Sequence, residues 1–283
     1  MFFNNIIKKE KKPYPFFEIK DFLKVNLYKN LRNDFIDIYR NNQNSNLFKK
    51  TEKGISDFKT SYFIGGGKEK DSYETFLSFS EKYKSIKDLL NLTYNQQFVD
   101  KIFALLGDKN FFKKNKLRYP NEKLSMLDYI FFNNVYINYK FSFFENNSGL
   151  GLHRDHGSKE VALLLYFGFS DNIDRSHGGT QVYHKNDDKV YKDHKIEEKD
   201  LTNFLLIHDQ KPIQNTLFGF KKTDNSWHGV KRINLPFKVL RLNLQINFMR
   251  LDSLKHNSIF YEKLKFKVLN FKLRFYKFIN KIG

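Results

Sequence analysis

The sequence of 283 residues contains no cysteine, which excludes disulfide bonds, cysteine-ligated zinc and iron–sulfur sites, and cysteine nucleophiles. It also has no stretch near the ~18 uncharged apolar residues that a membrane-spanning helix needs. The segment 1–12 places its lysines after its apolar residues and has no small-residue cleavage site, unlike a secretory signal. Because 40% of the residues are hydrophobic and 17% are aromatic, we expect a cytoplasmic globular protein with one sizeable core.

Arginine and alanine are scarce, and this scarcity changes how the net charge of +19 is interpreted. The chain has 41 Lys against 9 Arg and 32 Phe against 2 Ala, a bias toward residues with A/T-rich codons. Arginine is the side chain that base edges and phosphate groups favour. The composition therefore argues against a nucleic-acid partner, although basic surfaces in general attract polyanions.

Apolar periodicity predicts a mainly helical region over residues 1–127. Residues 15–23 have the pattern of a short strand that leads into a helix, and 86–106 carry a second helical pattern. Gly107 follows that pattern as a C-terminal cap. We assign 1–127 to an N-terminal support region that packs on the core.

Two further segments are polar or strongly basic. Residues 41–84 are expected to form a mobile loop, and the glycines at 65–67 lack the spacing of a phosphate-binding loop. Residues 253–283 are predicted to form a basic amphipathic helix, in which 254–283 carry eight Lys/Arg and one Glu, or +7. We favour packing of this helix on the core, with peripheral contact to an anionic membrane as the alternative.

The apolar period changes to that of strands between residues 128 and 252. Eight runs of strand length alternate with turn residues: Tyr129–Phe144, His153–Asp155, Val161–Phe167, Thr180–Tyr183, Phe204–Ile207, Thr216–Phe220, Trp227–Ile233 and Val239–Phe248. Short strands at this spacing favour antiparallel sheets closed into a jelly roll or a sandwich. We assign 128–252 to this core, so the predicted fold class is α+β.

One pattern among the eight histidines can hold a metal ion. His153 and Asp155 are two residues apart on a predicted strand, so both side chains project from the same face. With His228 they supply two imidazoles and one carboxylate, the facial triad of non-haem Fe(II) oxygenases, which leaves three positions for a chelating cosubstrate and O2. Arg241 lies within an apolar strand pattern, where burial without an anionic partner is costly, whereas Arg232 lies near a turn.

Neighbouring side chains are assigned other roles. Arg154 lies between His153 and Asp155, out of phase with them, and is expected to point away from the metal. Trp227 is expected to pack on the opposite face of the strand from His228.

The ordered set of motifs resembles the 2-oxoglutarate- and Fe(II)-dependent dioxygenases, specifically the prolyl-4-hydroxylase-like branch. The resemblance covers most of residues 13–249 and is carried by the segments 15–23, 147–155, 162–167, 178–180, 227–230 and 241–243. It implies a double-stranded β-helix, or jelly-roll, core between the N-terminal helical region and the C-terminal basic helix.

The resemblance also implies roles for individual residues. His153, Asp155 and His228 would hold Fe(II), and Arg241 would form an ion pair with the C5 carboxylate of 2-oxoglutarate. Tyr166 stands where relatives often place a tyrosine hydroxyl on that carboxylate.

Two positions depart from the family pattern. Asn243 stands where relatives commonly carry Ser or Thr, and its amide can still donate a hydrogen bond. Phe143 and Phe144 stand where many relatives have a tyrosine. Contacts to the cosubstrate are therefore expected to differ in detail.

The implied reaction is hydroxylation of a C–H bond in a peptidyl proline, an amino acid or a small metabolite, with succinate and CO2 as coproducts. The cofactors are Fe(II), 2-oxoglutarate and O2, with ascorbate as a further candidate. The alternative is a non-catalytic jelly-roll binding module whose basic tail binds an anionic membrane or nucleic acid.

Overall fold

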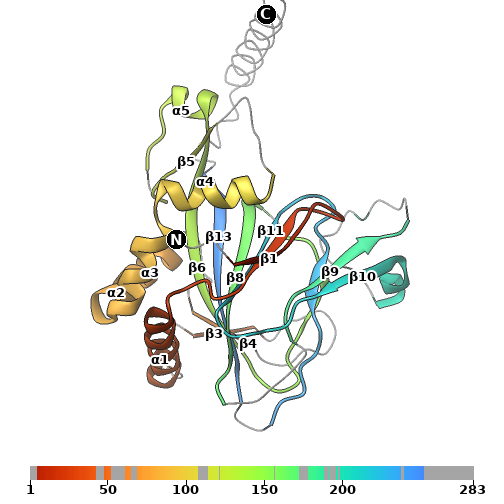
Figure 1. The fold of residues 1–283 in the computed structure, drawn as a ribbon. Helices are drawn as coiled ribbons and strands as arrows, with labels where there is room; N and C mark the ends of the chain where they lie inside the picture. The colour runs from red at the N-terminus through yellow and green to blue at the C-terminus, as the bar shows by residue number, and fades with distance from the viewer. Residues whose placement is uncertain are drawn as a thin grey trace, which may run out of the picture.

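Two β-sheets form the centre of the structure, a computed structural model (Figure 1). It describes residues 5–42, 48–51, 61–64, 69–107, 114–120, 122–155, 157–171, 178–187, 191, 196, 198–236 and 239–251. The nine-stranded major sheet has the order β1 (Ile6–Glu10), β2 (Phe16–Ile19), β11 (Thr216–Lys221), β8 (Lys159–Phe169), β13 (Arg241–Arg250), β6 (Phe132–Phe144), β4 (Ser61–Ile64) and β3 (Phe48–Thr51), with β5 (Lys114–Leu117) also paired to β6. The minor sheet has the order β10 (Phe204–Asp209), β9 (Gln181–Lys185), β12 (His228–Val230) and β7 (Leu150–His153).

The eight strands from β6 to β13 form a jelly roll. Strands β6, β8, β11 and β13 belong to the major sheet, and β7, β9, β10 and β12 belong to the minor sheet, so the chain passes repeatedly from one sheet to the other. The strands pair antiparallel within each sheet. The predicted double-stranded β-helix is confirmed.

Helices cover the outer face of the major sheet (Figure 1). They are α1 (Val25–Asn42), α2 (Glu69–Lys82), α3 (Lys84–Thr93) and α4 (Gln96–Leu105), while α5 (Met126–Phe131) and the 3-10 helix η1 (Glu198–Asn203) are short. Helix α1 forms an apolar stripe because its buried residues recur three or four apart: Tyr28, Leu31, Phe35 and Ile38. The ring of Phe35 packs on Phe141 of β6, 4.0 Å between centroids.

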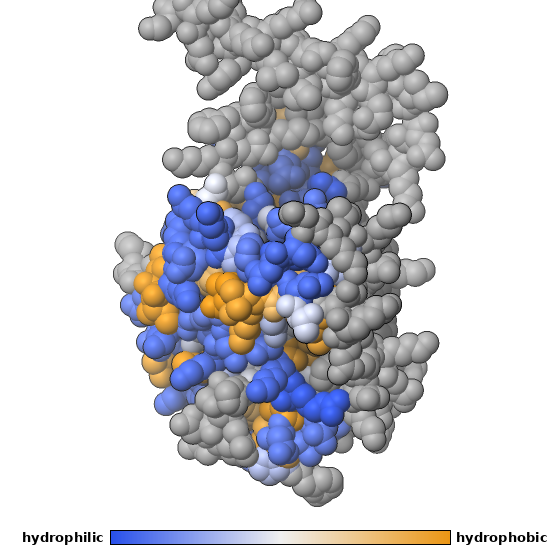
Figure 2. Space-filling model, turned by 90° about the vertical axis from the view of Figure 1, so that its right-hand side faces the viewer, coloured by the Kyte–Doolittle hydropathy of each residue, from blue (hydrophilic) through white to orange (hydrophobic). Residues whose placement is uncertain are grey.

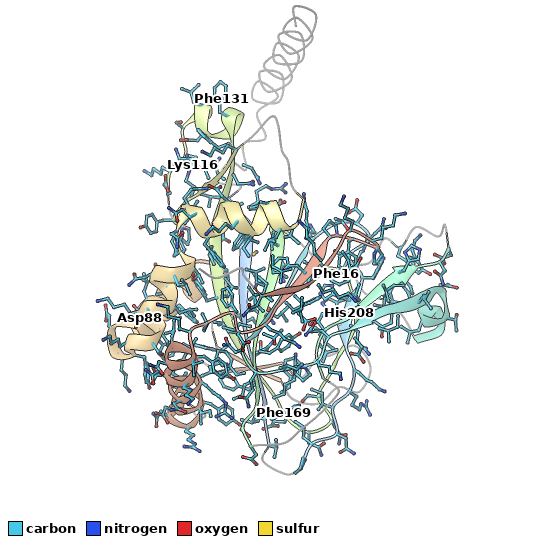
Figure 3. All side chains as sticks on the ribbon, viewed as in Figure 1. Phe16, Asp88, Lys116, Phe131, Phe169 and His208 are labelled. Carbon is cyan, nitrogen blue, oxygen red and sulfur yellow. The ribbon has the colours of Figure 1, made fainter. Side chains whose placement is uncertain are left out.

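Alternation along β6, β8 and β13 divides their side chains between two cores. One set packs with the helices: Val135, Ile137, Tyr139, Phe141, Phe143, Val161, Leu163, Leu165, Leu242, Leu244, Ile246 and Phe248. The other set faces the minor sheet, where a separate cluster contains Ala162, Leu164 and Tyr166. The inner cluster continues to Phe16 on β2, which stacks on His208 of β10 at 5.4 Å (Figure 3). The interior between the sheets therefore has its own lining, distinct from the helix-packed core.

Parts of the sequence prediction were wrong. The expected loop 41–84 contains β3, β4 and all of α2, while 65–68 lie outside the described residues. The start of the predicted strand Tyr129–Phe144 is the end of α5, whose Ser125 cap and Asp128 form a capping box.

The predicted boundary after residue 127 does not divide the sheet. Strands β1 to β5 all precede that boundary and join the major sheet. The predicted C-terminal helix over 253–283 lies outside the described residues. None of the helices within the described part of the chain is both long enough and apolar enough to cross a lipid bilayer.

The minor sheet has an apolar edge on the surface. Strand β10 is one of its two edge strands and exposes three consecutive residues, Leu205, Leu206 and Ile207. Figure 2 views this side of the molecule and shows hydrophobic residues exposed among hydrophilic ones.

Candidate metal and cosubstrate site

The two predicted histidine ligands lie side by side on adjacent strands of the minor sheet. His153 ends β7, His228 begins β12, and the two residues are direct partners in the antiparallel ladder. Their rings lie 4.2 Å apart between centroids. The pairing explains how residues 75 positions apart in the sequence reach one point.

Both imidazoles are held in the tautomer that a metal ligand requires. Nδ1 of His153 lies 2.8 Å from the carbonyl oxygen of Gly151, and Nδ1 of His228 lies 2.8 Å from that of Ser226. Because a carbonyl oxygen only accepts, each Nδ1 carries the proton and donates it. Each Nε2 therefore presents a lone pair.

Asp155 joins the histidines from just beyond the strand. We expected both side chains to project from one strand, but β7 ends at His153. Asp155 therefore reaches the histidines from the segment that follows the strand. Oδ2 of Asp155 lies 3.8 Å from Nε2 of His228 and has no hydrogen-bond partner among the described residues. The ligand atoms of Asp155 and the two histidines all lie within 4.8 Å of one another.

The protonation states of this group suit a divalent metal. Burial, followed by repulsion from His228, lowers the pKa of His153 from 6.5 to about 3. Burial also lowers the pKa of His228. For Asp155 burial alone would raise the pKa, but the Lys159 ammonium and the two imidazoles hold it below its ordinary value. Two neutral nitrogens and one carboxylate oxygen result, a donor set that fits Fe(II) with open positions.

Lys159, which sequence reasoning missed, orients the carboxylate. Its Nζ lies 2.7 Å from Oδ1 of Asp155, and both side chains are largely buried. Strict alternation would turn Lys159 outward with Val161, but a bulge between the pairs Phe248–Val161 and Met249–Lys159 reverses its face. Lys159 thereby occupies one carboxylate oxygen and leaves Oδ2 for the metal.

Arg241 lies deep on the inner face of β13. Its side chain is completely buried, and its three guanidinium nitrogens have no hydrogen-bond partner among the described residues. The guanidinium contacts the rings of Phe144, 4.6 Å from the centroid, and Tyr166, 5.4 Å away. Burial lowers the pKa of Arg241, which the nearby Tyr166 partly opposes. A buried arginine, whose planar guanidinium can donate two parallel hydrogen bonds, fits the far carboxylate of a dicarboxylic cosubstrate.

Two polar side chains flank Tyr166 in the sheet. Asn243 follows Arg241 on the inner face, is directly paired with Tyr166 of β8, and has a buried Oδ1 without a partner among the described residues. Thr216, the partner of Tyr166 on β11, has a buried hydroxyl that also has no hydrogen-bond partner among the described residues. Sequence reasoning missed Thr216, because only the strand register brings it beside Tyr166.

Tyr166 itself is already engaged. Its hydroxyl lies 2.8 Å from Oγ1 of Thr180 and accepts the backbone N–H of Thr180 at 3.0 Å. Burial raises the pKa of Tyr166. The Thr180 contacts fix the tyrosine ring against Arg241 and join β8 to the turn before β9.

The remaining residues lie as their sequence positions suggested. Phe144 faces inward onto Arg241, whereas Phe143 packs with the helices. Trp227 is buried in a cluster with Leu152 and Phe204, on the other side of the strand from His228. Arg154 turns away from the metal site and stacks on Trp227 at 4.6 Å.

The comparisons with known proteins concern structure alone, since no family model and no curated protein matches the sequence. A prolyl hydroxylase from Trichoplax adhaerens, in complex with a hypoxia inducible factor peptide fragment, is 12% identical with a TM-score of 0.45 over 83% of each chain. A prolyl-4-hydroxylase from Pseudomonas putida is 13% identical with a TM-score of 0.40, over 83% of this chain and 92% of that one. HygX from Streptomyces hygroscopicus, with nickel, 2-oxoglutarate and hygromycin B bound, is 9% identical with a TM-score of 0.44, over 84% and 83%. These values are too low to carry an assignment, and the function proposed below follows from the site itself.

Proposed function

We propose that the protein is a 2-oxoglutarate- and Fe(II)-dependent dioxygenase that hydroxylates a C–H bond. The observation that carries the proposal is the triad of His153, Asp155 and His228, whose unprotonated donor atoms converge within 4.8 Å inside a jelly roll. When bound, iron would supply O2 activation coupled to decarboxylation of 2-oxoglutarate to succinate and CO2.

The residues of the chain divide the remaining tasks. The two histidines and Asp155 hold the metal, and Lys159 fixes which carboxylate oxygen faces it. Arg241, whose side chain is completely buried, supplies the counter-charge for the C5 carboxylate of 2-oxoglutarate.

The two ends of this site share one lining. Phe220 contacts the ring of His228 at 4.6 Å and belongs to the same inner cluster as Tyr166, which adjoins Arg241. A chelating dicarboxylate could therefore extend from the metal to the arginine without leaving the interior of the barrel. The substrate is a peptidyl proline, an amino acid or a small metabolite.

Conversion of 2-oxoglutarate to succinate tests this function without knowledge of the substrate. Purified protein with Fe(II), ascorbate, 2-oxoglutarate and O2 is expected to form succinate slowly by uncoupled turnover. Asp155→Ala should abolish that reaction, because the metal loses the only anionic ligand that the triad supplies. Asp88→Ala is the matched control, since Asp88 is exposed on α3 and far from the site (Figure 3). Succinate formation that persists in Asp155→Ala would refute the proposal.

A further inference from the structure

Two edge strands expose large apolar side chains. Within the described part of the chain, β1 at the edge of the major sheet pairs only with β2, and β10 at the edge of the minor sheet pairs only with β9. Five of their apolar side chains are between 38% and 52% exposed: Ile6, Ile7, Leu205, Leu206 and Ile207. A single exposed apolar residue is ordinary, whereas a cluster of them marks an interaction surface. Whether these five form a cluster depends on how close the two strands lie.

Contacts between side chains place β1 beside β10. Nζ of Lys8 on β1 lies 3.2 Å from Nδ1 of His208 on β10. The neighbouring strand β2 contacts β10 as well, because the ring of Phe16 stacks on His208 at 5.4 Å (Figure 3). Nε2 of Gln210, the residue after β10, donates to Oε1 of Glu18 at 3.0 Å. Since Glu18 is the direct partner of Lys8, the hairpin of β1 and β2 packs along β10.

Each of the two strands has a bulge directly before this contact. The register of β1 shifts at Ile7 and that of β10 shifts at Ile207, so neither isoleucine has a partner in its ladder. Because Ile7 precedes Lys8 and Ile207 precedes His208, the two isoleucines flank the contact between the strands. We define the edge patch as the five exposed residues on these strands: Ile6, Ile7, Leu205, Leu206 and Ile207. It lies on the side of the molecule that Figure 2 shows.

The bulges argue against a partner that adds a strand to the sheet. Such a partner needs a regular row of backbone hydrogen-bonding groups, and a bulge interrupts and twists that row. Leu205 and Leu206 point to opposite faces of β10 by alternation, yet both are exposed. The partner therefore has to surround an apolar edge, which a fluid surface can do without a matching groove.

Lysines lie around the edge patch and exclude a second partner. The segments 5–12 and 205–211 contain five lysines and two acidic residues, a net charge of +3: Lys8, Lys9, Lys11, Lys12 and Lys211 against Glu10 and Asp209. All of these lysines except the half-buried Lys8 are exposed. Two copies that met through this patch would bring like charges together, in a chain that carries +19 in total. The charge favours an anionic partner.

We infer that the edge patch docks the protein on an anionic lipid surface. The isoleucines and leucines enter the boundary between headgroups and acyl chains, and the lysines contact the anionic headgroups. The patch lies on β1 and β10, whereas the histidines of the metal site lie on β7 and β12, so the inference is independent of the proposed function.

The test is sedimentation of the full-length protein with vesicles. One set consists of phosphatidylcholine alone, and the other contains about 30% phosphatidylserine, so that the two differ in surface charge. The wild-type protein is expected to bind the anionic vesicles at least about 10-fold more tightly than the neutral ones, because several lysines each interact with the anionic surface.

Two variants remove apolar side chains of the patch and leave the net charge unchanged. The triple variant Leu205→Ser, Leu206→Ser and Ile207→Ser should bind anionic vesicles about 10-fold more weakly or worse, since it loses the apolar area that enters the lipid. Ile6→Ser with Ile7→Ser should also weaken binding, and it tests the patch from the other strand. Circular dichroism and Tm show that each variant is folded.

The matched control removes three exposed apolar residues from helices α1, α2 and α5. It combines Val25→Ser, Leu77→Ser and Leu127→Ser, which leave the charge and the edge patch intact. This control should bind anionic vesicles like the wild-type protein.

Three results would overturn the inference. The wild-type protein would remain in the supernatant with anionic vesicles, or both patch variants would bind as tightly as the wild-type protein, which would assign binding to charge alone. The third is a dimer of the wild-type protein, detected by light scattering without lipid and lost in the triple patch variant. That result would assign the patch to contacts between copies of the chain.

Discussion

Replacement of Arg241 by methionine should have opposite effects on stability and on cosubstrate binding. The guanidinium is completely buried and has no hydrogen-bond partner among the described residues. An unpaired buried cation costs several kcal/mol. Its contacts with the rings of Phe144 and Tyr166 offset about 1–2 kcal/mol of that cost. Without a bound anion, Arg241 therefore destabilises the fold.

The magnitudes follow from these contributions. A hydrophobic residue of similar volume in place of buried ionic groups is neutral or stabilises by about 1–4 kcal/mol. After the lost ring contacts are subtracted, we expect Arg241→Met to raise the free energy of unfolding by about 1 kcal/mol, or Tm by about 2–4 °C. The same variant should bind 2-oxoglutarate at least about 30-fold more weakly, because a buried charge pair loses about 2 kcal/mol or more.

Thermal unfolding of the Mn(II)-loaded protein, with and without 2-oxoglutarate, measures both effects. At about 100 times its Kd for the wild-type protein, the cosubstrate should stabilise the wild-type protein by about 2.7 kcal/mol and the variant by less than about 1 kcal/mol. Arg32→Met is the control, because Arg32 donates to the carbonyl oxygens of Phe169 and Ser170 and has a structural role. That control should lose stability and keep cosubstrate binding. If Arg241→Met behaved like Arg32→Met, the reasoning about Arg241 would be wrong.

Four further predictions concern the pH dependence of metal binding, the pH dependence of stability, a turn and the tyrosine. The pKa of His153 is about 3 in the folded protein and 6.5 in the unfolded chain, so the folded imidazole stays unprotonated down to about pH 3. The Kd for Mn(II), measured by titration calorimetry, should therefore change less than about threefold from pH 7.5 to 5.5. If the histidine ligands had ordinary pKa values, each would weaken Mn(II) binding about 10-fold over this range. The unfolded chain takes up a proton at His153 as the pH falls from 6.5 to about 3, so the unfolding free energy of the metal-free protein should decrease over that window, and an increase would contradict the burial of His153. Gly179→Ala should lower Tm by several degrees, since an added Cβ would lie 1.6 Å from the carbonyl oxygen of Gln210, and an unchanged melting curve would contradict that packing. Tyr166→Phe removes the hydroxyl that contacts Thr180 and should weaken 2-oxoglutarate binding about 5- to 10-fold without loss of metal. Equal affinity of the variant and the wild-type protein for 2-oxoglutarate would contradict a role of the Tyr166 hydroxyl in positioning the ring beside Arg241.

The strands and the metal ligands could be predicted because their signals are local. Runs of apolar residues with turns between them define β8, β11 and β13 to within two residues of the expected ranges. His153 and Asp155 form a short motif, and the burial of Arg241 follows from its apolar strand. Such features depend on neighbours in the sequence.

Other contributors depend on register and could not be predicted in the same way. Lys159 reaches Asp155 because a bulge reverses its face, and Thr216 reaches Tyr166 only through the pairing of β11 with β8. The local periodicity of the sequence predicts neither the position of a bulge nor the strand with which a given strand pairs.

Two errors in the predicted elements have different causes. The segment 41–84 was expected to be a loop because it is polar, yet its strands β3 and β4 extend the major sheet from β6. Pairing with the edge of an existing sheet can stabilise a strand whose own sequence has only a weak β propensity. By contrast, Ser125 and Asp128 form a capping-box pattern that could have revealed the start of α5.

The visible spectrum of the protein with Fe(II) and 2-oxoglutarate, recorded without O2, tests the central claim most directly. A cosubstrate that chelates iron held by His153, Asp155 and His228 should give a saturable charge-transfer band. His153→Ala should abolish the band, and Arg241→Met should shift its saturation to higher 2-oxoglutarate concentrations. Stoichiometric iron binding with no such band would contradict the account and favour a non-catalytic jelly-roll binding module.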